Sequence, residues 1–118
     1  MLMHIVLLTF KNPWSWASIE AIDAERSTRA HPNYIDEIKG WTCGRNITRR
    51  HIAADFVVIG LFEDRTTLER YIVHPNHQVG VAKWKAIADW QVVDIELSSD
   101  FTQNMGLLSV FNQLAEAC

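Results

Sequence analysis

LMHIVLLTFK, residues 2–11, is rich in β-forming side chains and ends before Asn12-Pro13, so it predicts a β-strand. Alternate side chains of a strand point to opposite faces, and both alternating sets are apolar here. A strand of this kind is covered on both sides, which places it in the centre of a sheet. His4 is the one ionisable side chain on its own face, where it is either a hydrogen-bonded core histidine or a site residue.

The rest of the chain supplies further helices and strands in a recognisable order. Sequence patterns predict a helix over residues 14–30, strands over 37–45 and 54–62, and a strand over 90–98. A further helix starts at Asp64 or at Thr66, which has Glu69 at capping-box spacing, and a helical pattern resumes after His74-Pro75. The order β-α-β-β-α-β is the signature of a ferredoxin-like α+β fold with a four-stranded antiparallel sheet.

The first predicted helix begins and ends at prolines. Asn12 is a suitable N-cap and Pro13 a suitable first helical residue. We expect an apolar stripe of this helix to be buried; it consists of Trp16, Ala17, Ile19, Ala21, Ile22 and Ala24. His31 precedes Pro32, which disfavours a further helical turn, so His31 is expected to be an exposed residue at the helix end.

Composition and charge limit the function classes. The chain has 118 residues and a net charge of −3, without the basic stripe that nucleic-acid binding requires. The apolar residues 1–8 lack a basic region and are too few to span a bilayer, so neither a signal peptide nor a membrane partner is expected. Two cysteines, Cys43 and Cys118, do not make a disulfide framework, which favours a reduced, cytoplasmic setting.

Length indicates one domain, residues 1–98, followed by an extension over residues 99–118. Apolar residues recur at helical spacing after Gly106, which predicts a short amphipathic helix. Its apolar face is expected to pack on its own domain or on a partner subunit.

Four elements of the chain resemble the stress-responsive A/B barrel (Dabb) family. They are MHIVLLTF at residues 3–10, GRNIT at 44–48, DFVV at 55–58 running into FED at 62–64, and YIVHPNH at 71–77. The resemblance implies a ferredoxin-like domain that dimerises through its sheet faces into an α+β barrel. More distantly the chain resembles a plant polyketide cyclase, olivetolic acid cyclase.

The resemblance also implies where a site lies. Tyr71 and His77 match the tyrosine and histidine that act on the cyclase substrate, and His4 matches a pocket histidine. A further pocket histidine of the cyclase falls near Phe56. The candidate catalytic residues are therefore Tyr71 and His77, and the candidate ligand-binding residues are His4, Phe56, His74 and Trp84.

Two functions follow from these residues. In the first, the cleft between the sheet and helices of a homodimer binds a small apolar or aromatic ligand without chemistry. In the alternative, a cofactor-free cyclase, isomerase or monooxygenase-like enzyme uses His77 as a base, while Tyr71 holds a carbonyl oxygen that gains charge. Against both stands a structural reading, in which His74 and His77 only cap helix ends.

No metal or cofactor is expected. Pro75 separates His74 from His77 and disturbs the helical spacing that two ligands would need. Cysteines or carboxylates at ligand spacing are missing nearby, and the sequence has no glycine-rich phosphate loop.

Overall fold

A computed structural model describes residues 1–97 and places four strands in one antiparallel sheet with the order β2-β3-β1-β4. The strands are β1 (Leu2–Phe10), β2 (Gly40–Arg45), β3 (Phe56–Phe62) and β4 (Ala88–Glu96). The predicted central position of residues 2–11 is confirmed, because β1 pairs with both β3 and β4. The predicted extension over 99–118 lies outside the described residues.

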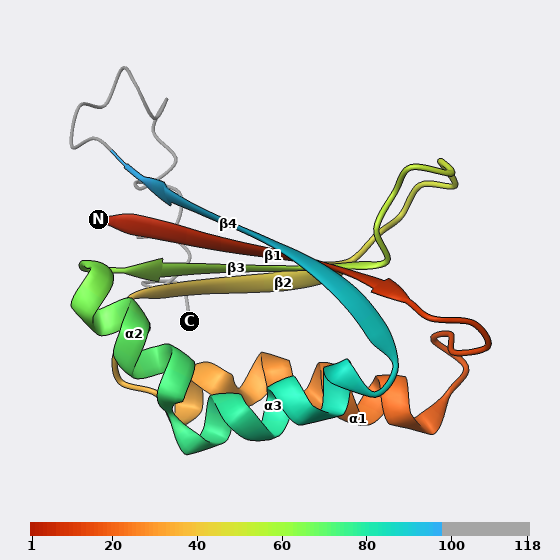
Figure 1. Ribbon diagram of the computed structural model, residues 1–118, viewed down its shortest axis with the longest axis horizontal. Helices are drawn as coiled ribbons and strands as arrows, with labels where there is room; N and C mark the ends of the chain where they lie inside the picture. Colours follow the sequence, from red (N-terminus) through yellow and green to blue (C-terminus); the bar gives the residue numbers. More distant parts are fainter. Residues whose placement is uncertain (98–118) are drawn as a thin grey trace.

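The helices form a second layer on one face of the sheet (Figure 1). They are α1 (Ile19–Ala30), a short 3-10 helix (His31–Asn33), α2 (Arg65–Val73) and α3 (Pro75–Lys85). The predicted ferredoxin-like order is therefore confirmed. Of the two predicted caps of α2, the chain uses Asp64 rather than Thr66, and the Asp64 carboxylate accepts a hydrogen bond from the backbone N–H of Thr67. Among residues 1–97, no helix is both long and apolar enough to cross a bilayer.

The first helix differs from its prediction at its start and on its buried face. It begins after Ser18 rather than at Asn12-Pro13, because residues 11–18 form turns instead. Ile19 is 79% exposed, whereas the smaller Ala21 and Ala24 are completely buried. The prediction is therefore confirmed for Ala21 and Ala24 and wrong for the two isoleucines, since Ile22 is also 39% exposed. Small side chains allow a helix to lie close to the layer beneath it.

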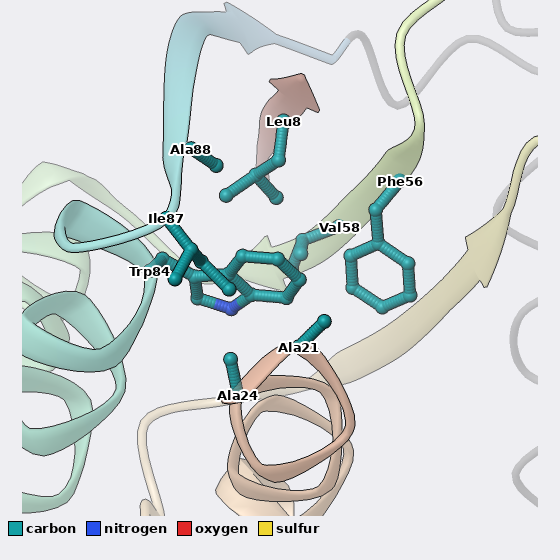
Figure 2. Close-up of a cluster of buried hydrophobic side chains, with 8 residues drawn as sticks. All are labelled: Leu8, Ala21, Ala24, Phe56, Val58, Trp84, Ile87 and Ala88. Atoms are coloured by element: carbon teal, nitrogen blue, oxygen red, sulfur yellow. The ribbon is translucent and has the colours of Figure 1, made fainter. Parts of the chain in front are cut away.

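The core between the layers consists of two clusters of buried side chains. Figure 2 shows the first of them, with Trp84 between strand residues above and the alanines of α1 below. The rings of Phe56 and Trp84 stack with centroids 5.4 Å apart. The second cluster has Phe62 and Tyr71 at its centre, with ring centroids 4.8 Å apart. These clusters hold α1, α2 and α3 against the sheet, at roughly 1.5–3 kcal/mol for each large apolar side chain that is fully buried.

The opposite face of the sheet is also apolar, and no helix described here covers it (Figure 1). Ile5 pairs with Ile59 of β3 and with Val93 of β4, and Leu7 pairs with Val57. Leu7 is 38% exposed and Val93 is 54% exposed. Contiguous exposed apolar surfaces of this kind are typical of interaction sites.

Candidate functional site

A cavity of about 320 Å³ lies between the sheet and the helix layer. This volume is at the small end of the usual range for small-molecule sites. Every strand except β2 contributes to its walls, as do α1, α2 and α3. The lining residues are His4, Val6, Leu8, Thr28, His31, Val58, Tyr71, Ile72, His77, Gln78, Gly80, Val81, Trp84, Trp90, Val92 and Asp94.

Tyr71 reaches this cavity from α2 and is only 2% exposed. Its ring packs against Phe62 at 4.8 Å and against Trp41 at 6.0 Å between centroids. Burial raises the pKa of the Tyr71 hydroxyl well above its ordinary value. The phenol therefore stays protonated at neutral pH and acts as a hydrogen-bond donor.

His77 lies at the start of α3, with its ring centroid 4.2 Å from that of Tyr71. Its Nδ1 lies 2.8 Å from the backbone carbonyl oxygen of Ile72. Because a carbonyl only accepts hydrogen bonds, Nδ1 carries the proton and Nε2 carries the lone pair. Burial lowers the pKa of His77, so the neutral imidazole is the prevailing form near pH 7. The Nε2 atom can therefore accept a proton or a hydrogen bond.

His74 serves a different purpose from His77. Its Nδ1 accepts a hydrogen bond from the backbone N–H of Asn76 at 3.1 Å, so His74 is the N-cap of α3. Pro75 occupies the first helical position, where its missing N–H costs nothing. His74 is not one of the residues that line the cavity.

His4 reaches the cavity from β1 and forms a pair with Asp94, its neighbour across β4. Its Nδ1 lies 2.5 Å from Asp94 Oδ1, and its ring meets that of Tyr71 edge to face at 5.7 Å. Asp94 was not predicted. Asp94 lies opposite His4 because of the pairing register of β1 and β4. The sequence of either strand alone does not determine that register.

His31 is the clearest error of the sequence analysis. It was expected to be exposed, yet it is 3% exposed and lines the cavity. The chain continues into a 3-10 turn at His31–Asn33, which turns the ring inward under α3. There its Nδ1 lies 2.6 Å from the Asn76 side-chain oxygen. The His-Pro step indicated a helix end correctly, but no local pattern indicated the inward direction of the ring.

The two remaining candidates are Trp84, which lines the cavity, and Phe56, which does not. Trp84 lines the cavity, and its indole N–H donates to Thr28 Oγ1 at 2.8 Å. Phe56 is 1% exposed and packs behind Trp84, so it supports the wall without forming part of it. In residues 1–97, no group of three or more histidine, cysteine or carboxylate side chains is placed to hold a metal ion.

Comparison with known proteins assigns this architecture to a family. The profile of the Stress responsive A/B Barrel Domain, Dabb, matches residues 2–97. The chain belongs to the Dabb family. An uncharacterized protein of Streptomyces coelicolor, SCO4036, is 33% identical over 96 residues, which are 81% of this chain and 99% of that protein.

Solved structures similar to this Dabb protein show the same fold. A dimeric ferredoxin-like protein of unknown function from Thermobifida fusca has a TM-score of 0.72 and 20% identity, covering 81% of this chain and 90% of that one. A hydroxynitrile lyase from Passiflora edulis has a TM-score of 0.70 and 15% identity, covering 85% and 95%.

Proposed function

We propose that this Dabb protein binds a small apolar or aromatic ligand in the cavity between its sheet and its helices. The observation that carries the proposal is the distribution of polar groups along the cavity. The surface of the wall is mainly apolar and includes valine, leucine and tryptophan side chains, whereas His4, His31, Tyr71 and His77 gather at one end. Apolar walls with a few convergent polar groups are typical of small-molecule sites. Of the candidate ligand contacts, His4 and Trp84 lie on the wall.

We propose further that the protein is a homodimer and that the apolar sheet face forms the interface. The dimeric Thermobifida fusca protein shares the fold. In this chain, apolar side chains from three strands cover the face opposite the helices; they are Met3, Ile5, Leu7, Val57, Ile59, Leu61, Val93 and Ile95. Met3 and Leu61 are already buried in the single chain. A second copy would remove the exposed members Leu7, Val93 and Ile95 from water, with a gain of roughly 25 cal/mol per Å².

Ligand binding can be tested by filling the cavity. Val81 lines it, while Val79 is two residues away on the same helix and 53% exposed. Purified protein is screened against a panel of aromatic ketones and phenols by thermal shift and by NMR. We expect at least one compound to bind the wild type, Val81→Phe to abolish binding, and Val79→Phe to preserve it. Failure of every compound, or equal binding by both variants, would contradict the proposal.

A second candidate function is proton transfer without a cofactor. It is favoured by the hydrogen bond from His77 Nδ1 to the Ile72 carbonyl, which leaves Nε2 unprotonated on a ring that packs against the ring of Tyr71. In this function, Nε2 takes a proton from a carbon next to a substrate carbonyl, and the C–H electron pair forms an enolate. Tyr71 donates a hydrogen bond to the enolate oxygen. The enolate carbon then attacks a second carbonyl of the same molecule, and the new alkoxide takes the proton back from His77.

The proton-transfer function is tested with β-polyketones and, because the fold is shared with a hydroxynitrile lyase, with α-hydroxynitriles. His77→Asn keeps a donor for the Ile72 carbonyl but removes the base, and Tyr71→Phe removes only the hydroxyl. Each is expected to lower turnover by roughly 10²–10⁴ while ligand affinity changes little. A wild-type protein that turns over no compound on the panel leaves ligand binding as the function.

A further inference from the structure

Neither proposed function assigns His31 a contact with the ligand. Its ring comes from the end of α1, far in sequence from Tyr71 and His77, yet it lies against both. The centroid distances are 6.4 Å to Tyr71 and 5.8 Å to His77. His31 therefore belongs to the polar end of the cavity rather than to the surface.

The hydrogen bond to Asn76 decides which nitrogen of His31 faces a ligand. Asn76 lies in the first turn of α3, and its side-chain oxygen is 2.6 Å from His31 Nδ1. That oxygen is an acceptor, so Nδ1 carries the proton and Nε2 carries a lone pair. Burial lowers the pKa of His31 and keeps the ring neutral. Among residues 1–97, no side chain or backbone group donates a hydrogen bond to Nε2.

Gly80 keeps this nitrogen open. It lies in the interior of α3, where glycine is less favourable than alanine. A Cβ atom at this position would lie 2.8 Å from His31 Nε2 and 2.9 Å from its Cε1. Both distances are shorter than carbon atoms tolerate, so a methyl group there would push the edge of the ring that carries the lone pair out of its position. The glycine allows the imidazole to approach α3 without losing its free acceptor.

Of the two cavity groups that lie against His31, only one is a donor. His77 presents an unprotonated Nε2, as His31 does, whereas Tyr71 presents one hydroxyl donor; His4 lies further along the wall and is paired with Asp94. A ligand with only a carbonyl satisfies Tyr71 and leaves the imidazoles without partners. A site that is built to bond a hydroxyl discriminates strongly against an analogue that lacks it.

We propose that His31 is a specificity-determining residue that accepts a hydrogen bond from a hydroxyl group of the ligand, and that Gly80 keeps it accessible. The selected ligand is an apolar or aromatic molecule that carries both a carbonyl and a hydroxyl group. This inference rests on the proposed ligand-binding function, because it names the chemistry that the same cavity prefers.

The test compares ligands that differ only in a hydroxyl group. Dissociation constants of 3- and 4-hydroxyacetophenone and of 3- and 4-methylacetophenone are measured by NMR titration. The wild type is expected to prefer at least one hydroxyl isomer by about tenfold over its methyl counterpart. His31→Asn retains a donor for Asn76 but lacks the distal acceptor, and it is expected to reduce that preference to about twofold or less.

Gly80→Ala tests the same role of His31 in hydroxyl preference without changing any polar side chain. It should abolish the hydroxyl preference, while Val79→Ala on the exposed side of α3 should preserve it. In the His31→Asn background, Gly80→Ala should cause no further loss, because the methyl group no longer meets an imidazole. Should Gly80→Ala fail to fold, ¹⁵N shifts of the wild-type imidazoles decide instead. A hydroxyl probe is expected to shift His31 Nε2 while Nδ1 stays protonated.

The outcomes separate this inference from the proposed function. Equal affinity of the wild type for hydroxyl and methyl compounds would overturn the role of His31 and leave ligand binding intact. The same holds if the hydroxyl preference persists in His31→Asn, or if the NMR shifts show the proton on Nε2. Binding of none of the four compounds would overturn the proposed site for aromatic ketones together with the role of His31.

Discussion

Acidification from about pH 7.5 to about pH 5.5 acts on two histidines of the cavity, His31 and His77. Burial lowers the pKa of both below the ordinary value of 6.5. In this interval the unfolded chain takes up protons at these positions and the folded chain resists them. A group that binds more protons when unfolded makes the protein less stable as the pH falls. The two histidines should therefore destabilise the fold below about pH 6.5, and they should have no effect on stability well above it.

The loss of stability has an upper limit, which is set by the ordinary pKa of histidine in the unfolded chain. If His31 stays neutral in the folded protein, the cost at about pH 5.5 approaches about 1.4 kcal/mol relative to about pH 7.5. His77 is less completely buried and solvent screens part of its effect, so its share is smaller. We expect about 2 kcal/mol for the pair. Glu25 does not contribute in this interval, because its pKa is lowered from 4.5 and its stabilisation is lost only at still lower pH.

Urea denaturation followed by tryptophan fluorescence measures this effect, since the chain has five tryptophans. The protein concentration is fixed, because dimer stability depends on it. The wild type is compared with the double variant His31→Asn/His77→Asn, in which the amides keep donors for Asn76 and the Ile72 carbonyl. The variant should lose about 2 kcal/mol less than the wild type between the two pH values. Identical losses in the two proteins would refute the assignment of neutral, buried imidazoles.

Other predictions concern the packing around the site and the sheet face. Leu7→Asp places a charge on the apolar face and should give the mass of one chain in light scattering, since an unpaired buried carboxylate costs several kcal/mol; a persistent dimer would exclude this face as the interface. Thr28→Ala leaves the Trp84 indole N–H without its 2.8 Å partner and should destabilise by about 1–3 kcal/mol, whereas Thr28→Ser should remain within about 1 kcal/mol of wild type in thermal unfolding. Glu25→Gln weakens the bidentate hydrogen bonds from Arg45 and should lower the free energy of unfolding by about 1 kcal/mol near pH 7. The difference from wild type should vanish once acid protonates Glu25. A difference that persists at low pH would point to packing instead.

The architecture was predictable because its signals are local and repeated along the chain. The apolar alternation of residues 2–11 predicted a central strand, and β1 indeed lies between β3 and β4. Capping chemistry alone restricted the start of α2 to Asp64 or Thr66, and Asp64 is the cap. The start of α1 was mispredicted because Asn12-Pro13 fits a helix start equally well, while the chain uses it in a turn. The buried face of α1 depended on how closely it approaches Trp84, which is a tertiary property.

The site was predictable only in part, for a related reason. Tyr71 and His77 lie six residues apart, and the sequence marked them through a recognisable element. Asp94 joins the site only through the register of β4 with β1. His31 joins it through a turn of its ring toward α3 and through Asn76, 45 residues further along the chain. A polar residue that the local sequence predicts to be exposed can be buried when a distant element supplies its hydrogen-bond partner.

The carbonyl oxygen of Ile72 accepts hydrogen bonds from the side chains of both His77 and Gln78, at 2.8 and 2.6 Å. It is one of the carbonyls at the end of α2 that lack partners within the helix. The orientation of the His77 ring is therefore set by a backbone atom. It does not depend on which side chains form the apolar end of the cavity. Val81 and Val92 line the cavity but take no part in this hydrogen bond, so their replacement should change the shape of the cavity while the proton arrangement on His77 stays as it is. The backbone thus fixes the polar centre of the cavity, and side chains fix the shape of its apolar part.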